Sequence, residues 1–88
     1  MQVKCLRLDT GETIIAHVKN KMFSYLVKQP KILLQEFDPD NERLNVQLGV
    51  WLPYADKPEF IIKKRNVVAE FRPRYNLEKN YLNSLAKI

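Results

Sequence analysis

The fold is decided first by the stretch VKCLRLDTGETIIAHV, residues 3–18, in which two alternating segments flank a polar turn. The first segment suits a β-strand. The turn contains Gly11, which can adopt a positive φ without steric cost. In the second segment Ile14, Ala16 and Val18 fall on one face. The pattern predicts a β-hairpin near the start of the chain.

The same two-residue period continues beyond this hairpin. Residues 23–27 resume it, and Pro30, which cannot donate to a β-ladder, predicts a bulge or bend. Residues 32–34 are apolar on both faces, as is typical of a covered central strand. The cleanest strand runs from Leu44 to Leu52, and Gly49 inside it predicts a sharp bend or a close backbone approach.

The last third of the chain adds two short strands and then changes period. Alternation predicts strands at residues 60–63 and 67–72, and Pro73 ends the sheet region. A helix is predicted over residues 76–86, with Asn76 as its N-cap. It is supported by one apolar stripe at helical spacing, which consists of Leu77, Tyr81, Leu85 and Ile88.

Short strands joined by tight turns in 88 residues predict a mainly β fold, a small, strongly bent five-stranded barrel with a C-terminal α-helix. We expect the barrel to occupy residues 1–75, with residues 76–88 forming a helix packed on the same domain. Unpaired sheet edges are natural sites for pairing between subunits. Oligomerisation would also add core that so small a domain lacks.

The composition is that of a globular protein, with 45% hydrophobic and 28% charged residues. No apolar run approaches the roughly 18–20 residues of a membrane span, and the first residues show no signal-peptide pattern. We therefore expect a cytoplasmic protein. The net charge of +5 moderately favours polyanionic partners. Acidic residues predominate at 36–59 and basic ones elsewhere, which indicates either a basic side with an acidic rim or solvated loops around a neutral core.

The sequence offers no residues placed for catalysis. His17, the only histidine, lies in mid-strand without a serine or cysteine placed as a nucleophile, which favours a structural role. Cys5 is the only cysteine, so a disulfide within the chain and a paired zinc site are excluded. Asp38, Asp40 and Glu42 alternate in a turn that lacks the length and glycine of a calcium loop. We expect no enzymatic activity, no metal and no cofactor.

Two loops carry residue types that suit nucleic-acid binding. The loop at residues 63–66 offers three adjacent cations and an amide for phosphates and base edges, although the pattern taken alone favours a solvated turn. The loop at residues 20–24 offers an amide, a cation and the ring of Phe23, which could stack on a base or belong to the core. The candidate binding residues are Asn20, Lys21, Phe23, Lys63, Lys64, Arg65 and Asn66.

The order of these segments resembles that of a known family. Residues 3–18 have a strand, a turn glycine and a second strand, and residues 44–51 form a long strand with Gly49 near its end. A hydrophobic residue and basic residues precede the last strand at 62–68. Together these features resemble the Sm/LSm domain. The segments 10–16 and 51–54, with Pro30 and Pro73, more closely resemble the short Sm-like proteins of tailed bacteriophages and marine metagenomes.

The chain departs from the family pattern in three places. A C-terminal helix replaces the N-terminal one. The loop at residues 20–24 lacks the aspartate of the family's uridine-binding motif, and no glycine follows the basic residues at 63–65. The resemblance therefore implies the fold without implying a preference for uridine.

The resemblance implies a homo-oligomeric ring in which the strand from Leu44 to Leu52 pairs with the strand from Val67 to Arg72 of the next subunit. Both candidate loops would face the central opening. The implied function is non-catalytic binding of single-stranded RNA in RNA processing or regulation, in the host cytoplasm if the protein is phage-encoded, with no membrane partner. Lys63, Lys64 and Arg65 would neutralise phosphates, Asn20 and Asn66 would donate hydrogen bonds, and Phe23 would stack.

An alternative function belongs to another class. The ring could be an assembly or adaptor protein that binds other proteins and no nucleic acid. The apolar segment from Trp51 to Tyr54 favours this alternative if it is exposed, but it could also cover the barrel or an interface.

Overall fold

The computed structural model describes residues 1–86 and is mainly β with one C-terminal helix, as predicted. In chain order the elements are β1 (Gln2–Leu8), β2 (Thr13–Asn20), β3 (Ser24–Asp38), β4 (Arg43–Val50), β5 (Glu59–Lys63), the 3-10 helix η1 (Lys64–Asn66), β6 (Val67–Phe71) and α1 (Tyr75–Ala86). Among these residues, no helix has the length and apolar character needed to span a membrane.

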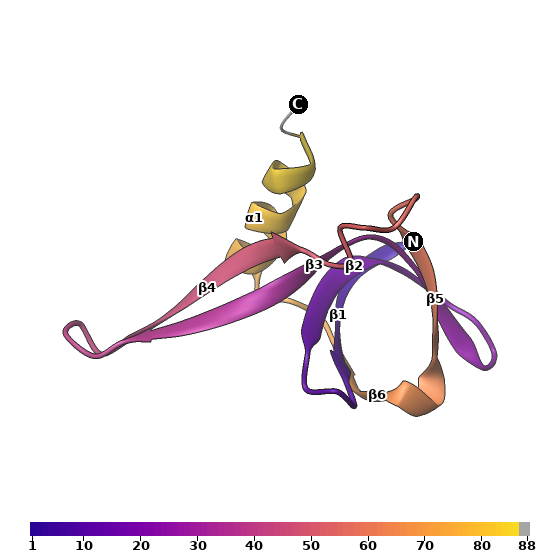
Figure 1. The fold of residues 1–88 in the computed structure, drawn as a ribbon, viewed down its shortest axis with the longest axis horizontal. Coiled ribbons are helices and arrows are strands. Elements are labelled where there is room, and N and C mark those ends of the chain that lie inside the picture. The colour runs from indigo at the N-terminus through magenta and orange to yellow at the C-terminus, as the bar shows by residue number, and fades with distance from the viewer. Residues whose placement is uncertain (87–88) are drawn as a thin grey trace.

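The strands form one open antiparallel sheet in the order β4-β3-β2-β1-β6. The long strand β3 pairs with β5 through Ser24 to Lys28 and with β4 through Lys31 to Asp38. In Figure 1, β1, β2, the first part of β3, β5 and β6 curve around a common centre, and the rest of β3 leaves with β4 as a two-stranded ribbon. The expected closure into a barrel stays a prediction, because the only link between β5 and β6 in the described residues is the short helix η1.

The sheet has six strands where a five-stranded barrel was expected. Residues 51–58 lie outside the sheet, between β4 and β5. The strand predicted from Leu44 to Leu52 ends at Val50. Leu52 has a φ of 55°, which no extended strand allows. Pro53 lacks a backbone donor and so cannot extend the ladder beyond Leu52, and the chain rejoins the sheet only after Pro58, where β5 begins.

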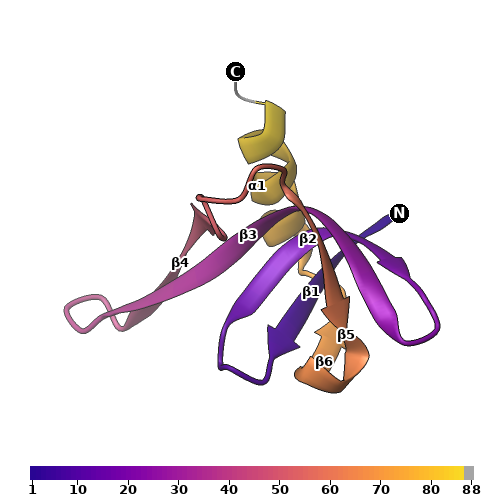
Figure 2. The ribbon, with the colours of Figure 1, turned by 45° about the vertical axis from the view of Figure 1, so that its right-hand side comes forward.

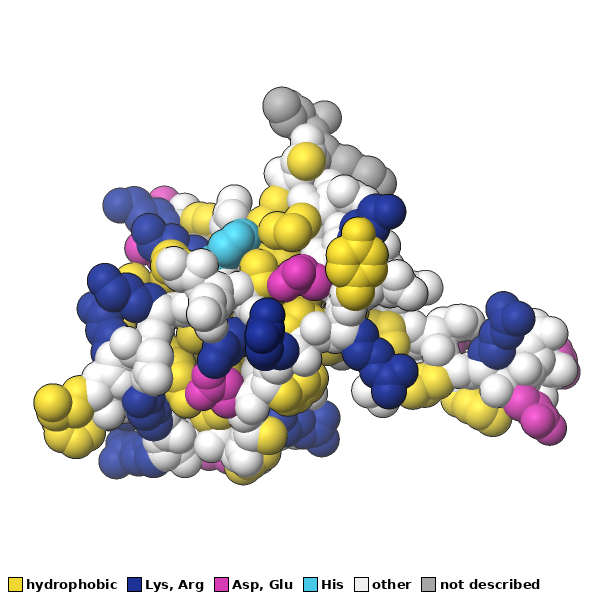
Figure 3. Space-filling view, turned by 180° about the vertical axis from the view of Figure 1, so that it is seen from behind, with side chains coloured by type: hydrophobic (Ala, Val, Ile, Leu, Met, Phe, Trp, Pro, Cys, Tyr) yellow, Lys and Arg dark blue, Asp and Glu magenta, His cyan; other side chains and the backbone are white. Residues whose placement is uncertain are grey.

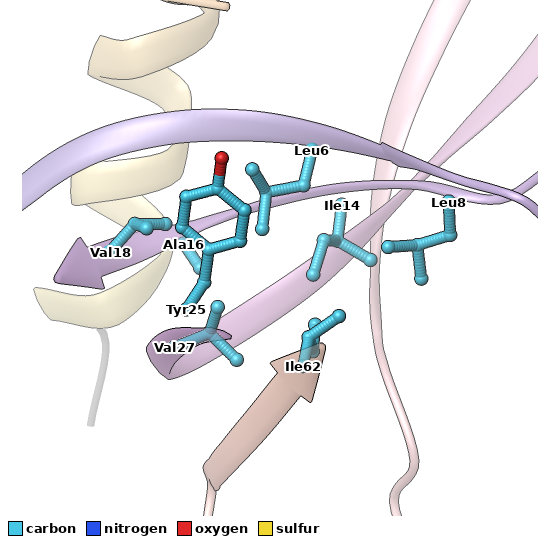
Figure 4. Close-up of a cluster of buried hydrophobic side chains, with 8 residues drawn as sticks. All are labelled: Leu6, Leu8, Ile14, Ala16, Val18, Tyr25, Val27 and Ile62. Atoms are coloured by element: carbon cyan, nitrogen blue, oxygen red, sulfur yellow. The ribbon is translucent and has the colours of Figure 1, made fainter. Parts of the chain in front are cut away.

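Apolar side chains from the concave face of the sheet fill the centre of the molecule. Period-two alternation in the first hairpin directs Leu6, Ile14 and Ala16 inward, and all three are completely buried. Burying one aliphatic side chain stabilises a fold by roughly 1.5–3 kcal/mol, so this cluster is a main source of stability. Figure 4 shows its members, which are Leu6, Leu8, Ile14, Ala16, Val18, Tyr25, Val27 and Ile62.

The bulge predicted at Pro30 is present in β3. Gln29 has a φ of 52°, and the register between β2 and β3 shifts at this point. The strand nevertheless continues on both sides, so the two runs expected at 23–27 and 32–34 are parts of one 15-residue strand. The bulge turns β3 from its pairing with β5 to its pairing with β4.

The expectation that residues 32–34 form a strand covered on both faces is wrong. Leu34 is 48% exposed, and Ile32 and Leu33 are only partly buried, because this part of β3 lies in the ribbon. Gly49 permits a close approach there, as predicted, since a Cβ at this position would lie 3.2 Å from Ile32 Cγ2.

Helix α1 packs on the face of the sheet opposite the central cluster (Figure 2). It begins at Tyr75, so Asn76 lies inside the helix and is not its N-cap. Leu77, Tyr81 and Leu85 contact the sheet as the stripe predicts, and Tyr81 forms a second buried cluster with Cys5 and Ile15. Ile88, the fourth residue of that stripe, lies outside the described residues.

Candidate functional site

The two loops singled out in the sequence lie side by side. Register pairing places Ser24 opposite Lys63 at the ends of β3 and β5. Beyond this pair, the backbone N–H of Lys64 donates to the carbonyl of Phe23 at 3.0 Å. The earlier loop is itself closed by the N–H of Lys21 donating to the carbonyl of Ser24, also at 3.0 Å. Segments about forty positions apart in the sequence therefore form one surface.

An exposed apolar patch lies at the centre of this surface. Phe23 is 79% exposed, so the alternative of a core phenylalanine is excluded. Met22 is 80% exposed and Ile61 is 69% exposed beside it. These side chains and the nearby cations line a groove of about 560 Å³, which is formed by Met22, Phe23, Ser24, Ile61, Lys63, Lys64 and Arg65. We call this groove the aromatic groove.

Met22 and Ile61 were not among the predicted site residues. Ile61 could have been found from alternation, because Phe60 and Ile62 on either side of it pack against the core and Ile61 must point outward. Met22 carried no such signal, since it lies in a loop between strands.

The aromatic groove is positively charged. Lys63, Lys64 and Arg65 line it, and no carboxylate does. Within residues 1–86, neither of the two ion pairs involves these three cations. Unpaired cations beside an apolar floor suit a ligand that carries negative charge and flat apolar groups.

The ring of Tyr25 holds the ammonium group of Lys64 in place. The Lys64 Nζ lies 5.2 Å from the centroid of this ring. The Tyr25 hydroxyl donates to Glu70 at 2.6 Å, and Lys4 forms an ion pair with the same carboxylate. The hydrogen bond to Glu70 raises the pKa of Tyr25 to about 12, and the bond from Lys4 lowers the pKa of Glu70. The ring therefore stays neutral and fixed beneath the cation at ordinary pH.

The three amide and lysine residues predicted with this site lie at its margins. Asn20 and Lys21 are exposed at the end of β2, and Asn20 lines a small hollow with Lys4 and Lys19 instead of the aromatic groove. Asn66 lines another hollow, where its carbonyl accepts a hydrogen bond from Asp9. The structure thus brings Phe23 together with the three basic residues, but not with the two asparagines.

The other polar residues considered for catalysis or metal binding make contacts within the fold. His17 Nδ1 lies 3.2 Å from the Tyr81 hydroxyl in a partly buried pair. Cys5 is buried, and burial raises the pKa of its thiol to about 11. Asp38 accepts hydrogen bonds from the Asp40 N–H and the Asn41 amide, as in a solvated turn. In the part of the chain that the structure describes, no three His, Cys, Asp or Glu residues are grouped as metal ligands.

A scan against protein-family models and a search of the curated proteins find no match to this chain. The arguments for its function therefore rest on the geometry of the aromatic groove and on the architecture of the sheet.

Proposed function

We propose that this protein binds single-stranded RNA without catalysis, as a homo-oligomeric ring of Sm-like subunits. The observation that carries the proposal is the convergence of Phe23 with Lys63, Lys64 and Arg65 in the aromatic groove. Cations that follow a phosphate backbone, combined with an exposed ring for stacking, are the usual means of binding a flexible single strand.

Each side chain of the aromatic groove has a distinct role in this proposal. The ring of Phe23 stacks on an unpaired base, and Met22 and Ile61 pack against the base edge or the sugar. Lys63, Lys64 and Arg65 neutralise phosphates. Asn20 and Asn66 lie outside the groove, so they would reach neighbouring nucleotides. A duplex fits poorly, because its bases are already stacked on each other and cannot cover the Phe23 ring.

The arrangement of the sheet supports the Sm-like part of the proposal. The strand order β6-β1-β2-β3-β5, with a three-residue 3-10 helix joining β5 and β6, brings both ends of the curved sheet to the same short connection. This agrees with a small, strongly bent barrel. The chain's loose motifs at residues 3–18 and 62–68 fall on the corresponding parts, β1–β2 and β5–β6.

The outer strands support assembly into a ring. Within residues 1–86, β4 and β5 each pair only with β3, and β6 pairs only with β1, so each of the three has one edge of free backbone groups. Such edges are templates for pairing with another chain. Joining β4 of one subunit to β6 of the next, repeated around a closed ring, would place several weak RNA sites on one particle and give avidity.

A binding titration tests the proposal. We expect the purified protein to bind labelled U-rich or A-rich single-stranded RNA, with an affinity that falls steeply as salt rises. The variant K64A/R65A removes two cations and should weaken binding and reduce the slope of log K against log salt by about 1–1.5. The control K57A/K79A removes two exposed lysines outside the groove and should leave the affinity almost unchanged. Equal effects of the two variants would contradict the site.

A second candidate function is a scaffold that binds other proteins and no nucleic acid. Tyr54 favours it, because this side chain is 84% exposed at the end of the apolar segment. Trp51 argues the other way, since it packs against the core, lies edge-on to Phe60 and donates a hydrogen bond to Glu12. A stable ring without salt-sensitive RNA affinity would favour the scaffold.

A further inference from the structure

A second hollow, of about 380 Å³, adjoins the aromatic groove. Ile61, Lys63 and Arg65 line both, so these three side chains form a ridge between the two spaces. On the other side the hollow is bounded by the turn between β1 and β2, by Trp51 and by Asn66. We call it the turn hollow. A ligand that lies in the aromatic groove and crosses the ridge enters it.

Asp9 and Asn66 form a polar corner of the turn hollow. The backbone N–H of Asp9 donates to the carbonyl of Asn66 at 2.8 Å, which holds the two residues side by side although they are far apart in the sequence. Asp9 is exposed and Asn66 is half-buried. Among residues 1–86, neither side chain takes part in a hydrogen bond or an ion pair. A carboxylate and an amide are therefore available to a ligand at this corner.

The second carboxylate of the turn hollow, Glu12, is already used by the fold. It accepts a hydrogen bond from the Thr10 hydroxyl at 3.0 Å and one from the Trp51 indole N–H at 3.2 Å. Trp51 also packs against the central cluster, so these contacts fix one wall of the hollow. Asp9 is thus the carboxylate that a ligand can use.

Charge gives the two spaces different roles. Carboxylates repel phosphate, so the turn hollow suits a base, whereas the aromatic groove, which no carboxylate lines, suits the backbone and a stacked base. Lys63 and Arg65 on the ridge lie where a phosphate between two nucleotides would pass. Lys and Arg side chains gather over the curved part of the sheet on the face seen in Figure 3, so the surroundings still attract a polyanion.

The two free side chains at the corner match one base. An ionised carboxylate only accepts hydrogen bonds, and it can accept two that are parallel. Guanine is the one RNA base whose Watson–Crick edge presents two adjacent donors, N1–H and N2–H, and an acceptor, O6, lies beside them. The amide of Asn66 carries the N–H donor that O6 requires. Bases in single-stranded RNA leave this edge free for protein contacts.

We propose that the turn hollow binds guanine, with the Asp9 carboxylate accepting from N1–H and N2–H and the Asn66 amide donating to O6. Asp9 is then the residue that sets the base preference of the nucleotide next to the one stacked on Phe23. Lys63 and Arg65 neutralise the phosphate that joins these two nucleotides. The inference rests on the proposed RNA binding and names the base that the protein prefers.

Four labelled strands test the preference. They are octauridine and three versions in which one central uridine is replaced by guanosine, adenosine or inosine. In fluorescence anisotropy at one salt concentration, we expect the guanosine strand to bind at least about fivefold more tightly than the adenosine strand. The inosine strand should fall between them, because inosine keeps N1–H and O6 but lacks the N2 amine.

Asp9→Asn tests the residue. It removes an acceptor, so the ratio of guanosine-strand to adenosine-strand affinity should fall to within roughly twofold of unity. The affinity for octauridine should stay equal or rise, because a negative charge is lost; a damaged fold would lower it. Asparagine suits a turn as well as aspartate does. Asn66→Ala keeps the carbonyl that Asp9 uses and should also lower the ratio. Asp56→Asn, an exposed carboxylate outside both spaces, is the matched control and should keep it.

The possible failures are distinguishable. A guanosine strand that binds the wild-type protein no better than the adenosine strand overturns the guanine site and leaves the proposed RNA binding standing. A preference that persists in Asp9→Asn, or that Asp56→Asn lowers equally, also overturns it. The absence of salt-sensitive binding to all four strands overturns both the guanine site and the proposed function.

Discussion

The side chain of Phe23 provides the most direct test at the scale of single residues. It is 79% exposed, so its removal costs the fold little, whereas stacking on a base is worth about 1–3 kcal/mol. We expect Phe23→Ala to weaken single-stranded RNA binding by roughly 5–150-fold and to leave the unfolding midpoint unchanged. Fluorescence anisotropy measures the affinity and urea titration the stability.

Tyr54 supplies the control for this substitution. It is another exposed aromatic residue, at 84%, and it lies outside the aromatic groove. Tyr54→Ala should therefore leave RNA affinity within about twofold of wild type, a difference of less than 0.5 kcal/mol. If the two substitutions weakened binding equally, exposed rings in general would be responsible, and the stacking role of Phe23 would be wrong.

The sequence predicted the components of the site better than their arrangement. Lys63, Lys64 and Arg65 were recognisable as three adjacent cations in a predicted loop, and they do lie together with Phe23. The sequence could not decide whether Phe23 was buried, because a ring at a strand end fits either place. That depended on the pairing of β3 with β5, which is a long-range contact. The same pairing places Asn20 and Asn66 outside the groove.

At the scale of secondary structure, Tyr81 attaches the helix to the bulge of β3. Its ring is fully buried, and its hydroxyl donates to the carbonyl of Gln29 at 2.8 Å. Burial raises the pKa of this hydroxyl to about 12, so it stays protonated and able to donate. We expect Tyr81→Phe to keep the packing, to leave that carbonyl without its donor, and to lower the free energy of unfolding by about 1–2 kcal/mol. Urea unfolding measures the change.

Tyr75 offers the same substitution on the same helix in a different setting. Its side chain is 74% exposed, so Tyr75→Phe should change the stability by less than about 0.5 kcal/mol. If Tyr81→Phe were equally mild, water would be replacing the lost donor, and the hydroxyl would not be what fixes α1 to the bulge.

The elements differ in how well the sequence predicted them, and the reason is physical. The first hairpin and the helix followed from local periodicity, because their buried faces are set by β1–β2 pairing and by one helical stripe. Residues 32–34 were misjudged because an apolar run on both faces has two explanations. It can be a central strand of the same chain, or, as here, a ribbon with an uncovered face. Local pattern does not distinguish them.

At the scale of the whole molecule, RNA affinity should depend on assembly. One aromatic groove is small and open to solvent, so a single copy makes few contacts with a strand. A ring that presents several grooves to one long RNA makes the later binding events intramolecular, which can raise the apparent affinity by about 10²–10⁴. Antiparallel pairing of β4 with β6 of the next subunit would place Arg72 and Arg74 beside Asp40 and Glu42, so the variant R72E/R74E should weaken assembly of the proposed ring. Because this variant leaves the groove intact, we expect it to lose affinity only through the loss of avidity, which anisotropy titrations would measure as weaker binding of a long single strand.

A short oligonucleotide that spans only one groove separates avidity from damage to the site. R72E/R74E should bind it nearly as well as wild type, because the loss of two cations outside the groove affects only the general electrostatic attraction. Phe23→Ala should weaken the short and the long RNA alike. If R72E/R74E instead lost both affinities equally, the arginines would contact RNA directly and the ring would not be the source of tight binding. Adding D40K/E42K to R72E/R74E restores opposite charges at the proposed contact while both arginines remain replaced. Recovery of long-strand binding in that fourfold variant would exclude direct contact by the arginines and show that the assembled particle binds tightly.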